Sequence, residues 1–270
     1  LKLSVGTIDN CIREAGLAAD PIHDELIAEL RESTLAYVDE TTWKEKRRAL
    51  WLWVFVTANV VLFCVGRRTR QVVLDILTED YLGWLMSDGL MNYRIFKKRL
   101  RCLAHLIRKS KGLADSLDKE TKGFGKRALE VLEFVIEQTR DGPDPTVFKP
   151  ILSDFKQLCE WHRDLTPTGK LRSLAVEFLN DWDAIWQVLE NPELPLTNNE
   201  AERALRHWVI ARQISHGTRT EEGSRVLSVL ASVIETCRRR GVSPWDYLAV
   251  VIAERRKGNS APPLPLPMAA

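Results

Sequence analysis

Two aspartates stand at the ends of short apolar stretches and could share a metal ion. Asp39 lies at the polar end of residues 34–40, and Asp88 follows residues 83–87; both stretches have the composition of buried strands. If the strands are neighbours, the two carboxylates meet at one edge of a sheet, where open sheets bind ligands. Adjacent carboxylates repel each other unless a cation lies between them, and oxygen ligands suit Mg²⁺ or Mn²⁺. The pair therefore indicates phosphoryl transfer in which two ions activate a water or a 3′-hydroxyl and stabilise the leaving oxygen.

Each aspartate taken alone has a simpler interpretation as a turn or cap residue, because aspartate is a common turn former. The segment Ser87-Asp88-Gly89 in particular could be a plain turn. The occurrence of two acids at matched strand ends weakens this interpretation without removing it.

A third carboxylate is commonly needed to hold the second ion, and the pattern offers two candidates. Asn198 or Asn199 is a plausible N-cap of a helix whose first turn carries Glu200 and Glu202. First-turn acids also favour the helix dipole without any catalytic role. At helical spacing both glutamates flank the apolar side at similar angles, so periodicity does not choose between them. That apolar side runs through Ala201, Leu205, Trp208 and Val209.

The elements that must position these acids follow from the hydrophobic pattern. Adjacent strands followed by a helix and another strand predict a mixed sheet flanked by helices, an α/β (α+β) fold. Pro21 is placed near the start of a second helix of the lead-in, and residues 58–59 form a hairpin turn. The helical stretch before the third acid is too long for a loop and is therefore an insertion. The expected segments are a helical lead-in (1–33), the first part of the core (34–104), an all-helical insertion (105–196), closing helices of the core (197–257) and a disordered tail (258–270). The first part of the core contains the strands 34–40, 50–57, 60–65 and 83–87 and a helix at 69–77.

Composition excludes several classes of protein. The chain of 270 residues is 45% hydrophobic and 28% charged, which excludes global disorder, and its formal net charge is only +2. Five scattered cysteines form no disulfide framework, so we expect a reducing, cytoplasmic compartment. The apolar stretch 49–65 is too short and too polar at its middle for a membrane span. Because the sequence begins with leucine, we expect it to be a fragment.

Several motifs together resemble the insertion-sequence-66 type of bacterial DDE transposase. The resemblance extends from about residue 3 to residue 257 and is specific only when the motifs are taken together. The matching stretches are YVDETTW from Tyr37, WLWV from Trp51, SDG from Ser87 with Tyr93 beyond it, CLAH from Cys102 with Arg108, LTNNEAERALRHWVIARQISHGTRTEEGSRVLSVLASVIETCRRRG from Leu196, and PWDYL from Pro244.

This resemblance implies an RNase H-like fold with an all-helical insertion between the second and third acids. It implies that Asp39, Asp88 and Glu202 are the catalytic, metal-binding triad, since the family's third acid is the glutamate of its Asn-Asn-x-Ala-Glu-Arg motif. Two Mg²⁺ ions, replaceable by Mn²⁺, would be the cofactors, with no organic cofactor. The implied partners are DNA, as element ends and target, and a second copy of the chain on paired ends, in the bacterial cytoplasm at the nucleoid.

Further polar residues near the triad have expected supporting roles. Cys102 and His105 match a cysteine-two-residues-histidine element of related enzymes, and we expect them, with Asn199, to support the active site. A second such spacing, Cys159 with His162, makes a four-ligand zinc site conceivable, although a cysteine within an amphipathic helix is usually a packing residue.

Basic clusters close to these elements are where a phosphate backbone would lie, although such runs are by default solvated faces. The expected DNA contacts are Lys97, Lys98, Arg99, Arg101, Arg108, Lys109, Arg203 and Arg206.

The sequence differs from the family pattern in two respects, and two other functions are compatible with it. Full-length members of the family usually carry an upstream end-binding module, which we expect this chain to lack, and Gln213 replaces a usual base. A catalytically decayed, element-derived DNA-binding protein and an RNase H-like nuclease that cuts without strand transfer are the alternatives to a transposase core.

Overall fold

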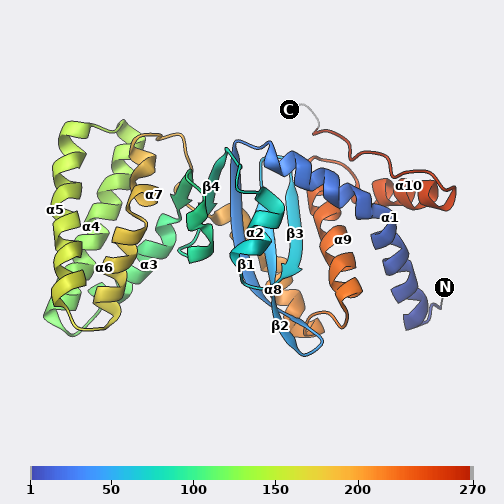
Figure 1. Ribbon diagram of the computed structural model, residues 1–270, viewed down its shortest axis with the longest axis horizontal. Coiled ribbons are helices and arrows are strands. Elements are labelled where there is room, and N and C mark those ends of the chain that lie inside the picture. Colours follow the sequence, from blue (N-terminus) through green and yellow to red (C-terminus); the bar gives the residue numbers. More distant parts are fainter. Residues whose placement is uncertain (1, 268–270) are drawn as a thin grey trace. The chain divides into compact units, whose positions relative to one another are not determined.

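The computed structural model describes residues 2–267 and divides the chain into two compact units. Unit 1 comprises residues 1–85 and 199–270, and unit 2 comprises residues 86–198. The sequence placed the start of the helical insertion at residue 105, whereas the chain passes from one unit to the other within a strand, after Leu85. Figure 1 labels most of the helices and strands of both units.

The five strands form a mixed sheet in the order β3-β2-β1-β4-β5, which confirms the predicted mixed α/β class. The predicted succession of three strands, a helix and a strand is also confirmed. The three-residue strand β5 was not predicted, because a segment this short carries no periodicity. These elements are β1 (Leu35–Glu45), β2 (Arg48–Val56), β3 (Val61–Gly66), α2 (Arg70–Leu77), β4 (Trp84–Ser87) and β5 (Arg99–Arg101).

Unit 1 begins with one continuous helix, α1 (Val5–Arg31), so the prediction of two helices divided near Pro21 is wrong. A proline inside a helix has no N–H to bond the carbonyl four residues earlier, here that of Leu17. Arg255 supplies the missing donor, since its Nη1 lies 2.7 Å from the Leu17 oxygen. The helix therefore tolerates Pro21 because another helix satisfies the freed carbonyl.

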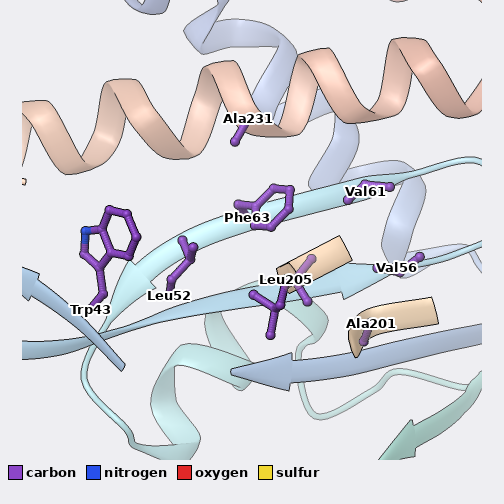
Figure 2. Packing of buried hydrophobic residues seen from close by; sticks show 9 residues of the cluster. Trp43, Leu52, Val56, Val61, Phe63, Ala201, Leu205 and Ala231 are labelled. Atoms are coloured by element: carbon purple, nitrogen blue, oxygen red, sulfur yellow. The ribbon is translucent and has the colours of Figure 1, made fainter. Parts of the chain in front are cut away.

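The closing helices of unit 1 pack on the strands as predicted. They are α8 (Asn199–Ser215), α9 (Glu221–Arg239) and α10 (Pro244–Arg256). A buried cluster joins α8 and α9 to one face of β1, β2 and β3 (Figure 2). Its buried members from the helices and the strands include Ala201, Leu205, Ala231, Leu52, Val54 and Phe63.

The outer edge of β3 is covered by polar side chains, which removes an exposed strand edge. Ser232 and Thr236 of α9 accept hydrogen bonds from the backbone N–H groups of Phe63 (2.8 Å) and Val61 (3.0 Å). The Phe63 carbonyl lies 3.0 Å from Nε2 of His23 in α1. The buried hydroxyls of α9 thus stand where another strand would pair.

The tail after α10 corrects a second prediction. It has no helix or strand up to residue 267, but Leu264 is buried. The Tyr247 hydroxyl donates to the Pro262 carbonyl at 2.7 Å, and Arg240 donates to that of Pro265 at 3.0 Å. The expectation of disorder is therefore wrong for residues 262–265, because two buried side chains bind their carbonyl groups.

Unit 2 is helical after β5, as predicted. Its core contains stacked and edge-to-face contacts among Phe124, Phe155, Phe178, Trp182 and Trp186, with ring centroids 5.0–6.4 Å apart. The elements are a short 3-10 helix η1 (Met91–Ile95), the helices α3 (Leu103–Ala114), α4 (Lys119–Asp141), α5 (Pro145–Leu165), α6 (Lys170–Asn180) and α7 (Trp182–Trp186), and the 3-10 helix η2 (Gln187–Leu189).

Candidate active site

Asp39 lies inside β1 and not at its end. The predicted strand stops at Glu40, but β1 continues to Glu45 because the polar residues after Asp39 still pair with β2. Asp39 stands opposite Val54, and directly opposed residues point to the same face of a sheet. Val54 belongs to the buried cluster beneath α8, so Asp39 projects from the sheet face that α8 covers. The expectation of a carboxylate at the polar end of this strand is therefore wrong. Asp39 lies within the strand, and the alternation of side chains along the strand directs it to the face that α8 covers.

Glu202 lies in the first turn of α8, the helix that covers this face of the sheet. It follows Ala201, which is completely buried in the cluster that includes Val54, and it is half-buried itself. Unit 1 thus carries two of the three candidate acids around one apolar cluster. Asn199 begins α8 and is exposed, and Asn198, directly before the helix, is buried.

Glu200 occupies a different environment, although the two glutamates were equivalent by periodicity. Its carboxylate accepts hydrogen bonds from Arg239 at 2.7 Å and from Arg203 at 2.9 Å. The hydrogen bond from Arg239, the largest effect, and the charges of both arginines lower the pKa of Glu200. Glu200 and Arg239 also line a pocket of about 600 Å³ next to Tyr37. Two guanidinium groups therefore already bind the Glu200 carboxylate.

Asp88 belongs to unit 2, directly after β4. Its Oδ1 accepts a hydrogen bond from the Leu90 backbone N–H at 2.9 Å, so the residue does form the turn that the simpler interpretation expected. Among the described residues, Oδ2 of Asp88 accepts no hydrogen bond. Turn formation therefore uses one carboxylate oxygen and leaves the second for another ligand.

Buried charges fix the position of the Asp88 turn. A Cβ atom added to Gly89 would collide with the guanidinium of Arg101 and crowd the Glu177 carboxylate. Arg101 is buried and hydrogen-bonds Glu177, which also accepts from Lys109 at 2.7 Å. The buried carboxylate of Asp181 lies 3.1–3.4 Å from three guanidinium groups, those of Arg94, Arg99 and Arg101. We call the six residues Arg94, Arg99, Arg101, Lys109, Glu177 and Asp181 the ion network.

The ion network corrects part of the predicted DNA-binding set. Arg101 is wrong as a DNA contact because it is only 2% exposed and bound to Glu177. Arg99 and Lys109 are likewise held by carboxylates of the network. Arg203 is exposed but pairs with Glu200. The other candidates are all exposed at the surface: Lys97, Lys98, Arg108 and Arg206.

Cys102 is buried immediately before α3 and contacts the chain next to Asp88. Its backbone N–H donates to the Ser87 carbonyl at 2.9 Å, and its Sγ accepts from the Asn198 N–H at 3.3 Å. His105 lies in the first turn of α3 and is half-buried. Cys102 therefore links the strand before Asp88 to the segment that leads into α8.

The conceivable zinc site is not formed. Within residues 2–267, no group of three or more potential metal ligands includes Cys159 or His162. Burial raises the pKa of the Cys159 thiol to about 12, so it is protonated and packs in the core. The His162 ring lies edge-on to Phe124 at 5.1 Å and its Nδ1 is 2.8 Å from the Thr166 hydroxyl.

Sequence reasoning missed the ion network and a basic hairpin. Asp181 stands about eighty positions from its arginine partners, so no local spacing reveals the network. The hairpin between β1 and β2 carries Lys44, Lys46, Arg47 and Arg48, a run visible in the sequence but hidden by the shorter strand predicted there. Within the part of the chain that is described, no helix has the length and apolar character that crossing a membrane requires.

The fold defines the class: a mixed α/β protein with a five-stranded sheet flanked by helices. Comparison with known families is more specific: residues 1–226 match the model described as Transposase IS66 family. The chain belongs to this family.

Relatives of the chain occur in Sinorhizobium fredii (strain NBRC 101917 / NGR234). The uncharacterized protein y4jO is 38% identical over 66 residues, which cover 24% of this chain and 21% of that protein. The uncharacterized proteins y4jD and y4qI are 21% and 23% identical over 89% and 90% of this chain. The chain spans about half the length of these two relatives, 54% and 52%.

Proposed function

We propose that this chain is the catalytic core of a DNA transposase, in which Asp39, Asp88 and Glu202 hold two divalent cations. Membership of the transposase family supports action on DNA. The single structural observation that supports this choice is that Asp39 and Glu202 lie on β1 and α8, two elements that pack around one buried cluster.

The donor set fits Mg²⁺ or Mn²⁺, which prefer carboxylate oxygens. The Leu90 N–H occupies Oδ1 of Asp88, and Oδ2 accepts no hydrogen bond from the described residues, so Oδ2 is available to a metal ion. Glu200 fits less well, because a cation would compete with Arg239 and Arg203 for its carboxylate. When bound, a pair of divalent ions supplies an activated water or 3′-hydroxyl and stabilises the leaving oxygen.

The residues of the chain would then position these carboxylates. The β1–β2 ladder and the α8 packing fix Asp39 and Glu202, while the Leu90 N–H and the buried Arg101 orient Asp88. Cys102 would support the site by holding Ser87. The exposed cations of the predicted set that would contact DNA phosphates are Lys97, Lys98, Arg108 and Arg206.

An RNase H-like arrangement, a homodimer on paired ends and a location at the bacterial nucleoid belong to the same proposal.

An assay of cutting and joining tests this function. Labelled duplexes that carry the ends of the encoding DNA element are incubated with the 270-residue chain and Mg²⁺ or Mn²⁺, with and without target plasmid. We expect nicked ends and, with target, joined products. Cut ends without joining would support the nuclease alternative, and binding without metal-dependent cleavage, in this chain and in a full-length relative, would support the decayed alternative.

A further inference from the structure

The helix α10 has apolar residues on two opposite sides, and the rest of the chain covers only one of them. Tyr247 and Val251 are buried on the inner side, where α10 packs against α1 and α9. On the outer side, Trp245 is 84% exposed and Val250 is 50% exposed. Figure 1 shows α10 beside α1 at the periphery of unit 1. Helices that are apolar on all sides are normally buried on all sides, which indicates that a partner covers the outer side.

The centre of this outer side leaves room for a second helix. Ala249 and Ala253 lie between Trp245 and Val250 in a helical projection, and both alanines are exposed. The distance between the axes of two packed helices depends on the side chains at the contact, so alanine at the centre permits a close approach. We call Trp245, Ala249, Val250 and Ala253 the outer face of α10.

The two ends of the outer face carry opposite charges that the chain itself neutralises little. Asp246 lies in the first turn of α10, and Lys257 follows the last residue of the helix. Among the described residues, no cation pairs with the Asp246 carboxylate, while its backbone N–H donates to the Ser243 hydroxyl at 3.3 Å. Lys257 pairs at 2.7 Å with Glu254 of the same helix, and an exposed pair of this kind contributes little to stability. A partner with the opposite order of charges therefore complements the outer face.

A second copy of α10, running antiparallel to the first, has this order of charges. When a two-fold axis passes the middle of the outer face, Ala249 of each copy meets Ala253 of the other. At about 100° per residue, Asp246 and Lys257 project on the same side of these alanines. The two-fold axis therefore brings Asp246 of each copy to Lys257 of the other, and the pair occurs twice.

The other side of the same helix pair joins an aromatic ring to a guanidinium group. Trp245 and Arg256 are exposed and project on the side of the alanines opposite to Asp246. Antiparallel pairing brings the Arg256 guanidinium of one copy to the Trp245 ring of the other, and a guanidinium over a tryptophan face is favourable. Arg256 already donates to Glu14 at 2.6 and 2.8 Å, which occupies the edge of the guanidinium and leaves its planar face for stacking.

We propose that the outer face of α10 binds a second copy of this chain, as an antiparallel helix pair related by a two-fold axis. The proposal rests on the proposed function insofar as it assigns a surface to the homodimer, and it goes further because this pair forms without DNA or metal. A pair of 13-residue helices is smaller than a standard protein interface, so the dimer is weak and dissociates on dilution.

Sedimentation velocity in EDTA and without DNA tests the pairing. The 270-residue chain is measured at concentrations up to about 0.5 mM, which populates even a weak dimer. We expect the wild type to pass from monomer to dimer as the concentration rises. Ala249→Glu inserts a longer, charged side chain at both contacts between the helices and should keep the protein monomeric throughout. Because position 249 is exposed and glutamate favours helices, thermal unfolding should be unchanged.

The matched control makes the same substitution on another helix. Ala28→Glu adds a carboxylate at an exposed position of α1 and should dimerise like the wild type. Dimerisation of Ala249→Glu at the wild-type concentration, or a wild type that stays monomeric over the whole range, would overturn this inference.

A charge swap tests the antiparallel register. Asp246→Lys and Lys257→Glu each replace two attractive contacts of the dimer by repulsive ones, so each should weaken the dimer by roughly fivefold. The double variant Asp246→Lys/Lys257→Glu restores opposite charges across the axis and should dimerise within about twofold of the wild type. Effects confined to the two ends of the helix would instead accumulate in the double variant, and that result would reject the proposed pairing.

The outcome is independent of the assay of cutting and joining, since neither DNA nor metal is present. Failure of the pairing would leave the proposed function standing wherever metal-dependent cleavage is observed. Conversely, a dimer with the expected response to the charge swap, together with an absence of cleavage, would reject the transposase activity and keep the interface.

Discussion

Asp39 and Asp88 are held in place by opposite means. Around Asp39, a continuous strand ladder and an apolar cluster from β2, β3, α8 and α9 fix the backbone. Around Asp88, the turn packs against the buried Arg101, which belongs to a network of four cations and two carboxylates. The free energy of unfolding falls gradually as atoms are removed from apolar packing, whereas it falls strongly when a buried charge loses its partner. The two halves of the proposed site should therefore respond differently to mutation.

The largest expected effect is from Asp181→Ala in the ion network. The substitution leaves Arg94, Arg99 and Arg101 without their shared carboxylate, and breaking a buried pair costs about 3–5 kcal/mol. We expect hydrogen exchange to accelerate throughout unit 2, including the peptide around Asp88, while β2 and β3 keep their protection.

The control for this change is Asp183→Ala, two positions away and exposed, which should alter the unfolding free energy by about 0.5 kcal/mol or less. Equal effects of the two variants would show that the network does not hold the Asp88 turn.

Leu205→Ala tests the apolar cluster of unit 1, the counterpart of the ion network. Leu205 is 3% exposed in the cluster beneath α8, and removal of a buried leucine side chain costs about 2–5 kcal/mol. Faster exchange should be confined to α8 and the facing strands of unit 1. Ile210→Ala on the same helix, at a side chain 55% exposed, should change the exchange little; faster exchange in unit 2 from Leu205→Ala would contradict the separation.

A smaller effect should appear with pH, through His23. Burial, and secondarily the charge of Arg225, lowers the pKa of His23, against the opposing effects of the Phe63 carbonyl and of Asp24 and Asp20. Below about pH 6.5, the ordinary pKa of histidine, the unfolded chain binds a proton that the folded chain excludes, so stability falls as pH decreases. The full contribution is present above that pH. His23→Gln should flatten the pH dependence of β3 protection between pH 7 and 5, and an unchanged slope would exclude His23 as its source.

The succession of strands and helix along the chain was predictable from the sequence, because alternation and β-branched runs are local properties. The continuation of β1 to Glu45 was not, since Thr41, Thr42 and Lys44 look like a polar end until their pairing with β2 is known. Nor was the continuity of α1 through Pro21, which depends on Arg255 more than two hundred positions away.

The candidate site was predictable to a similar degree. Asp39 and Asp88 followed from residue type and position, but Glu202 and Glu200 were separable only by family resemblance. The structure adds a physical difference, because Arg239 and Arg203 bind Glu200. Basic residues were the least predictable, because a run of charges does not reveal whether carboxylates distant in sequence bind them. Arg101 is buried and bound by Glu177, whereas Arg47 and Arg48 of the β1–β2 hairpin are exposed.

The most direct test of the proposed triad is the metal-dependent cleavage rate of four amide variants on element-end DNA. Asp39→Asn, Asp88→Asn and Glu202→Gln should each lower the rate by about a thousandfold or more, because each removes a charged oxygen ligand of the ions. Glu200→Gln should stay within a few-fold of wild type, since it alters only surface ion pairs. A Glu202→Gln variant that cleaves at the wild-type rate, or a Glu200→Gln variant that does not cleave, would contradict the triad.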